Sequence, residues 1–181
     1  MPDHHRRRLF GATAVLGGMA LSGMPMSAIT ASGRQSSPAK HDTVTLFLSG
    51  DVMTGRGIDQ ILPHPSDPVL YEPFMRTADG YVALAERDAG PIERPVDYGC
   101  IWGDARAVLA ERRPDLRIVN LETAVTTRST PWPNKGIHYR MHPQNMPALT
   151  AAGIDCCVLA NNHVLDWGRP GLAETLTALG R

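Results

Sequence analysis

Three short apolar runs along the chain predict β-strands. They cover residues 43–49 (TVTLFLS), 116–121 (LRIVNL) and 155–160 (DCCVLA). None of them alternates cleanly between apolar and polar positions, and a strand without alternation is typical of a parallel sheet that is buried on both faces. We therefore expect these runs to lie side by side as buried parallel strands.

Helical patterns separate the predicted strands. One covers residues 104–112 and stops before Pro114, and another covers 143–152 and stops at Gly153. A last pattern, over 170–180, carries leucines at helical spacing. Because helices and strands alternate along the chain, we expect an α/β fold with mainly parallel strands.

Residues 59–100 show a weaker pattern that prolines interrupt, with one plausible helix near 74–89. Connections of this length are usually functional or mobile. The segment is therefore either an excursion over the strand ends or a surface insertion without chemistry. A helix that closes at Gly180 should lead into another parallel strand. We accordingly expect residues 43–181 to form a C-terminally incomplete domain.

The first 31 residues have the features of an export signal. Three consecutive arginines, beginning at Arg6, precede a weakly apolar run rich in glycine and alanine. Glycines and Pro25 interrupt this run, so it lacks the roughly 20 continuous apolar residues that span a bilayer. The arginines favour a twin-arginine signal over a general secretory one. We expect an exported periplasmic or cell-envelope protein with a signal in 1–31 and a linker in 32–42.

The charge balance excludes one broad class of function. The chain has 18 Lys and Arg against 18 Asp and Glu, so bulk charge does not favour a nucleic-acid binder. Its 43% apolar residues lie far above the range of disordered proteins. Three cysteines without a zinc-binding spacing provide neither a disulfide framework nor a structural zinc site.

Polar side chains follow each predicted strand. Asp51 follows the first, Glu122 the second, and Asn162 and His163 the third. Carboxyl ends of parallel strands meet at one edge of a sheet, where ligands bind. This mixed oxygen and nitrogen set suits a divalent ion such as Mn, Fe, Zn or Mg. Taken singly, each residue also has an ordinary role in a turn, a loop or a hydrogen bond.

Four further residues are candidates for the same site. Asp166 either orients the imidazole of His163 and so takes part in catalysis, or caps the turn into the last helix. Arg56 is either a contact for an anionic substrate or a solvated turn arginine. Arg140 and His142 precede a predicted helix, where they either face a substrate or remain solvated.

Three motifs resemble one known family. SGDVM at 49–53, NLET at 120–123 and LANNH at 159–163 are similar to motifs of the CapA family, the capsule and poly-γ-glutamate synthesis proteins. The fold of that family is similar to calcineurin-like metallophosphoesterases. The resemblance covers about residues 43–181, which correspond to the N-terminal part of the family domain.

The resemblance implies a four-layer α/β/β/α sandwich of metallophosphatase type, with a metal centre at the strand ends. Asp51, Glu122 and Asn162 match its metal ligands, and His163 matches a neighbouring catalytic or substrate-contacting imidazole that also joins the metal set. This chain departs from ordinary metallophosphoesterases in two motifs. Met53 replaces the histidine of the first motif, and Asn-Leu-Glu replaces the second.

Three functions follow from this resemblance. The first is a role in synthesis or handling of an anionic cell-surface polymer such as poly-γ-glutamate, alongside a membrane-bound polymer synthase complex and without nucleic acid. The second is metal-dependent hydrolysis of a phosphoester or amide bond in another substrate. The third is an inactive fragment.

Overall fold

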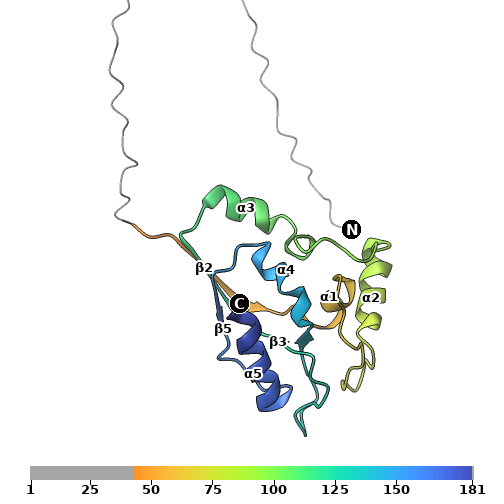
Figure 1. The fold of residues 1–181 in the computed structure, drawn as a ribbon. Coiled ribbons are helices and arrows are strands. Elements are labelled where there is room, and N and C mark those ends of the chain that lie inside the picture. The colour runs from red at the N-terminus through yellow and green to blue at the C-terminus, as the bar shows by residue number, and fades with distance from the viewer. Residues whose placement is uncertain (1–42, 181) are drawn as a thin grey trace, which may run out of the picture. The chain divides into compact units, whose positions relative to one another are not determined.

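A three-stranded parallel sheet lies along one side of the described residues (Figure 1). The computed structural model describes residues 43–180. Strands β1 (Leu46–Val52), β2 (Leu116–Leu121) and β5 (Cys156–Val158) lie in the order β1-β2-β5. The predicted α/β fold with mainly parallel strands is therefore confirmed. The predicted export signal (1–31) and linker (32–42) lie outside the described residues.

The register of the sheet aligns the carboxyl ends of its strands. Ile118 of β2 lies between Leu48 of β1 and Cys156 of β5. A shift in register between Ser49 and Asp51 then pairs Asp51 with Asn120. Such an irregularity bends a strand and redirects the side chains that follow it. The polar residues that end β1 and β2 thus lie next to each other.

Helices and one further small sheet complete the described part. The helices are α1 (Arg56–Ile61), α2 (Asp79–Ala89), η1 (Cys100–Trp102), α3 (Ala105–Arg112), η2 (Pro143–Asn145), α4 (Pro147–Thr150) and α5 (Gly168–Leu179). Strands β3 (Ala124–Val125) and β4 (Arg140–Met141) pair in parallel. The predicted helices near 74–89, 104–112 and 170–180 are present, whereas the one expected over 143–152 is two shorter helical turns.

The core lies between the sheets and α5. Leu121, Val125, Met141 and Leu149 form one buried cluster. Helix α5 is fixed to β3 by the hydroxyl of Thr175, which accepts a hydrogen bond from the backbone N–H of Val125 at 3.0 Å. These contacts hold the turn between β5 and α5, which carries His163, against the rest of the fold.

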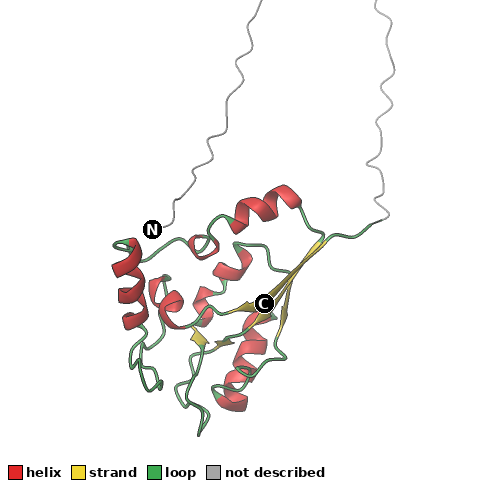
Figure 2. Ribbon diagram, turned by 180° about the vertical axis from the view of Figure 1, so that it is seen from behind, coloured by secondary structure: helices red, strands yellow, loops and turns green. Residues whose placement is uncertain are grey.

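The expectation that the strands are buried on both faces is wrong for residues 43–180. Helices α4 and α5 lie on one side of the three-stranded sheet (Figure 2). Leu48 on β1 is 67% exposed, and Leu46, Leu116 and Val158 are exposed as well. An apolar run without alternation shows that both faces are apolar, but it does not show that both faces are covered. The helices of the described part thus form a layer on one face of the sheet.

In residues 43–180, every helix is too short or too polar to cross a membrane.

Candidate functional site

His163 lies at the centre of a cluster of ionisable side chains. It is buried in the turn that follows β5. Its Nδ1 atom lies 2.7 Å from Oδ2 of Asp166, and its Nε2 atom lies 3.4 Å from Oε1 of Glu122. Both imidazole nitrogens are therefore next to a carboxylate, one on the same turn and one at the end of β2.

Asparagine side chains connect the ends of the three strands. The amide of Asn120 donates to Oδ1 of Asp51 at 2.6 Å. The amide of Asn161 donates to Oδ1 of Asn120 at 3.0 Å, while its own Oδ1 accepts from the backbone N–H of His163 at 3.0 Å. This chain of hydrogen bonds fixes the position of His163 relative to Asp51.

The surroundings of the Glu122 carboxyl raise its pKa. Partial burial raises its pKa above the ordinary value, and a hydrogen bond with Asp51 and repulsion by the Asp51 charge raise it further. His163 opposes these effects by attraction. A carboxyl with a raised pKa can hold and release a proton closer to neutral pH, which is what acid–base catalysis requires.

Asp166 is fully buried and accepts hydrogen bonds from three groups. These are Nδ1 of His163, the backbone N–H of Tyr139 at 2.6 Å, and the ammonium group of Lys135. The N-terminus of α5 shows no side-chain capping bond, so Asp166 does not cap that helix. Its carboxylate instead fixes the orientation of the imidazole. Lys135 and Tyr139 lie in the segment between β3 and β4 and were not anticipated from the sequence.

An aromatic ring covers the His163 imidazole. The Tyr139 ring stacks on it with centroids 4.0 Å apart and an interplanar angle of 23°. The guanidinium of Arg56 lies 4.7 Å from the Tyr139 centroid and 4.8 Å from that of Tyr81. It also pairs with Glu72 at 2.6 Å. Arg56 is therefore a packed, ion-paired residue close to the cluster.

Three other sequence candidates lie apart from this cluster. Asn162 is exposed, and its carbonyl accepts from Lys135. Arg140 is buried and donates to the carbonyls of Arg128 and Asp67, at 2.7 and 3.0 Å. His142 caps η2, where its Nδ1 accepts from a backbone N–H. Asn161, one position before Asn162, makes the side-chain contacts to the strand ends.

The cluster does not by itself form a metal-binding group. Across residues 43–180, no three side chains of His, Cys, Asp and Glu are placed so that they could hold an ion together. The Glu122 carboxylate lies beside Nε2 of His163, and the Asp51 carboxylate accepts from Asn120. In this arrangement the cluster is suited to proton transfer between its own members.

The fold and the cluster define an α/β protein with an acidic and imidazole site at the carboxyl edge of a parallel sheet. The chain belongs to the family described as bacterial capsule synthesis protein PGA_cap, whose model matches residues 45–181. The resemblance to capsule synthesis proteins that the three motifs carry is thereby confirmed.

Curated relatives agree with this assignment. Proteins named probable polyglutamine synthesis accessory protein, from two strains of Mycobacterium tuberculosis, are 54% identical over 138 residues, which is 76% of this chain and 36% of each relative. The capsule biosynthesis protein CapA of Bacillus anthracis is 25% identical over 147 residues, which is 78% of this chain and 28% of that protein. The chain thus spans about a third of the length of these relatives.

Proposed function

We propose that the protein takes part in the synthesis or handling of a capsular polymer such as poly-γ-glutamate, and that the His163 cluster is its chemical centre. The observation that carries this proposal is the placement of His163 between Asp166 and Glu122 at the strand ends. The names of the relatives, which refer to polyglutamine synthesis and capsule biosynthesis, support the biological setting.

The cluster supports acid–base chemistry on the bonds of such a polymer. Asp166 accepts from Nδ1 of His163 and so favours the tautomer whose Nε2 faces Glu122. In that tautomer Nε2 carries a lone pair that faces the lone pairs of the Glu122 carboxylate. A proton shared between the two groups removes this repulsion. His163 and Glu122 can then pass this proton to or from an amide or phosphoryl group bound at the edge of the sheet.

The wider setting is part of the same proposal. We propose that the protein is exported to the periplasm or cell envelope and works with a membrane-bound polymer synthase complex. The arginine-led apolar segment near the N-terminus supports export. We also propose that the parallel sheet belongs to a four-layer sandwich of metallophosphatase type, which its exposed apolar side chains support because such surface is normally covered.

The proposed function is tested by replacing His163 with glutamine in the organism that encodes the chain. We expect surface polymer, measured as glutamate released by hydrolysis, to fall at least tenfold, because a positioned acid or base contributes roughly 10²–10⁴-fold to a reaction. The matched control is His64→Gln, which changes an exposed histidine whose ring makes no hydrogen bond within residues 43–180. Normal polymer in the His163→Gln strain, with equal amounts of the protein, would contradict the proposal.

Metal-dependent hydrolysis is a second candidate function. The observation that favours it is the hydrogen bond between Nδ1 of His163 and the Asp166 carboxylate. Histidines that bind a metal through one ring nitrogen commonly donate the N–H of the other to a carboxylate. Asp51, Glu122, Asn162 and His163 would hold the ion, which requires Glu122 to separate from His163 and the exposed Asn162 side chain to turn towards the strand ends. When bound, a divalent ion would polarise the scissile group and lower the pKa of a water molecule.

Metal binding is tested by titrating the full chain with Mn²⁺ and with Zn²⁺ in a calorimeter. If this function is correct, one ion binds per chain and Asp51→Asn weakens binding by at least tenfold, because a ligand is lost. Asp88→Asn, which changes an exposed aspartate on α2, should leave the affinity unchanged. Absence of binding, or equal affinity in the two variants, excludes this second function.

A further inference from the structure

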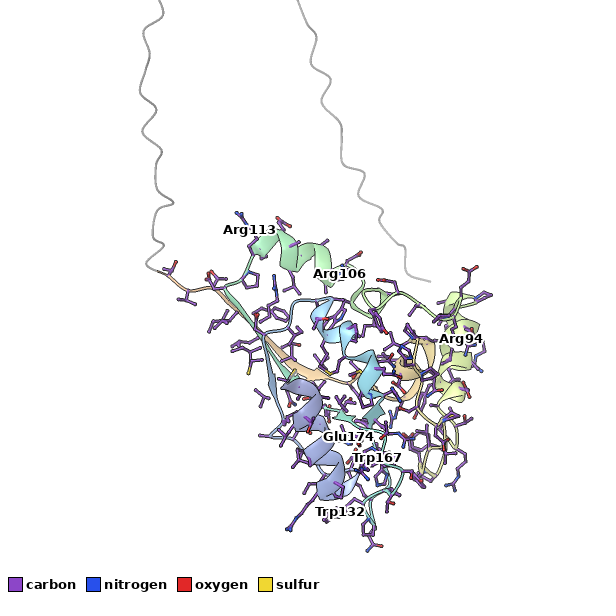
Figure 3. The ribbon with its side chains drawn as sticks, viewed as in Figure 1. Arg94, Arg106, Arg113, Trp132, Trp167 and Glu174 are labelled. Atoms are coloured by element: carbon purple, nitrogen blue, oxygen red, sulfur yellow. The ribbon has the colours of Figure 1, made fainter. Side chains whose placement is uncertain are left out.

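A pocket lies beside the start of α5, on the segment that connects β3 with β4. Its volume is about 400 Å³, within the range of roughly 300–1,000 Å³ that ligand pockets occupy. We call it the Trp132 pocket, and its main lining residues are Arg128, Pro131, Trp132, Pro133, Trp167 and Pro170. Figure 3 shows Trp132, Trp167 and Glu174 at the same end of the molecule, with Arg113 at the opposite end.

The backbone of Trp132 is fixed by hydrogen bonds, while the residue is 44% exposed. Prolines precede and follow it, which restricts the backbone on both sides. Its backbone N–H donates to the carbonyl of Asp166 at 2.7 Å, and its carbonyl contacts Nε2 of His138 at 2.9 Å. An exposed indole on a fixed backbone can bind a ligand with little further loss of conformational entropy.

A buried tryptophan contributes to the pocket wall. Trp167 is 4% exposed, and its Nε1 donates to the carbonyl of Tyr139 at 2.9 Å. The guanidinium of Arg140 lies 4.3 Å from its ring centroid. These contacts fix the Trp167 ring, so the pocket has a rigid wall beside the exposed Trp132 ring.

Arg128 supplies the charge of the pocket. Its backbone N–H donates to Oγ1 of Thr126, and its carbonyl accepts from Arg140. The Arg128 side chain is 60% exposed, and its Nε lies 3.5 Å from a carboxylate oxygen of Glu174. Within residues 43–180, no hydrogen bond joins its two terminal NH₂ groups to another residue. A guanidinium presents these groups as a fork that matches a carboxylate.

We propose that the Trp132 pocket binds a segment of an amide-linked polycarboxylate chain, an inference that rests on the proposed function. A carboxylate of the chain pairs with the terminal nitrogens of Arg128, and the adjacent methylene and amide groups pack on the Trp132 ring. The lining residues include an arginine, prolines and tryptophans, but no Asp, Asn, Glu or Gln. Because a neutral sugar needs hydrogen-bond acceptors, this lining favours an acidic chain.

The pocket is connected to the His163 cluster but distinct from it. The backbone of Asp166 bonds to Trp132, whereas the side chain of Asp166 bonds to His163. None of the residues that line the Trp132 pocket belongs to the His163 cluster, so a polymer segment held there would lie outside that cluster. The Trp132 pocket is accordingly a holding site for the polymer, separate from the reacting groups.

The proposal is tested by calorimetric titration of the full chain with a γ-linked glutamate oligomer. The comparison ligands are a γ-linked glutamine oligomer of the same length, which is uncharged, and a neutral oligosaccharide. We expect the glutamate oligomer to bind, and Trp132→Ala and Arg128→Gln each to weaken it at least roughly tenfold, as residues central to an interface do. Trp132→Phe should retain most of the affinity, and Arg113→Gln, which changes an exposed arginine after α3, should retain all of it.

The Trp132 pocket is excluded as a polymer site if the glutamate oligomer does not bind, if both pocket variants bind like the parent, or if the neutral oligosaccharide binds more tightly. Equal binding of the glutamine oligomer would contradict the role of Arg128. Circular dichroism of each variant shows that a loss of binding is not a loss of folding. If the pocket variants bind normally while His163→Gln still reduces surface polymer, the pocket proposal fails and the proposed function stands.

Discussion

Replacing Asp166 with asparagine is expected to lower the free energy of unfolding by about 3 kcal/mol, because removal of one partner from a buried ion pair typically costs roughly 3–5 kcal/mol. The Asp166 carboxylate is fully buried and accepts from Lys135, Tyr139 and His163. An asparagine of the same shape turns one acceptor oxygen into an NH₂ donor, so at least one of these donors loses its partner. Chemical denaturation of the full chain measures the effect.

The imidazole provides a second measurement on the same variant. In the parent, we expect nitrogen-15 spectra to show His163 with a proton on Nδ1, since this atom faces the Asp166 carboxylate at 2.7 Å. In Asp166→Asn the amide group can donate to Nδ1, which shifts the proton to Nε2. Asp88→Asn is the matched control, because Asp88 is exposed and its nearest arginine atom is 4.0 Å away. Unchanged stability and an unchanged tautomer would show that Asp166 does not orient His163.

The position of the cluster could be predicted because a general rule of parallel sheets applies to it. Asp51, Glu122 and His163 each follow an apolar run, and the carboxyl ends of parallel strands meet at one edge. The sequence could not resolve which of two adjacent asparagines faces the strands. The side chain of Asn161 reaches Asn120, whereas Asn162 is exposed, and a turn after a strand has no periodicity that separates neighbouring positions.

Residues that reach the cluster from irregular segments could not be predicted. Lys135 and Tyr139 lie between two strands of only two residues each, β3 and β4, which are too short to show alternation. Glu72 comes from the proline-interrupted segment 59–100 and reaches Arg56 only through the tertiary fold. Local sequence patterns carry no information about such long-range contacts.

The error about burial has a different physical origin. The runs 43–49 and 116–121 are apolar on both faces, and the sequence reports that property correctly. The helices of the described part cover one face, so Leu48 remains 67% exposed. Whether an apolar face is covered depends on the elements that pack on it, and a strand's own sequence does not contain this information.

Replacing Glu72 with glutamine is also expected to destabilise the protein by about 3 kcal/mol, again because an uncompensated charge remains inside. The Glu72 side chain is 1% exposed and that of Arg56 is 16% exposed, and the two lie 2.6 Å apart. Chemical denaturation measures the loss. The matched control is Glu86→Gln, which interrupts the more exposed pair between Glu86 and Arg94, whose side chains are 27% and 40% exposed, and should cost about 0–1 kcal/mol. Similar losses of unfolding free energy in the two variants would show that the Glu72–Arg56 pair stabilises the protein no more than the Glu86–Arg94 pair does.

Tyr81 reports independently on the same substitution. Burial and, after it, the hydrogen bond with Glu72 raise the pKa of Tyr81 from the ordinary value of 10.0 to about 12. Because the folded state holds this proton more tightly, Tyr81 contributes stability below pH 10 that is lost as the pH rises towards about 12. In Glu72→Gln, phenolate absorbance should appear at lower pH, and the alkaline loss of stability should be smaller. Arg56 lies between the rings of Tyr81 and Tyr139, and Tyr139 covers His163. The Glu72→Gln variant therefore also tests whether Glu72 supports the His163 cluster indirectly, through Arg56 and Tyr139.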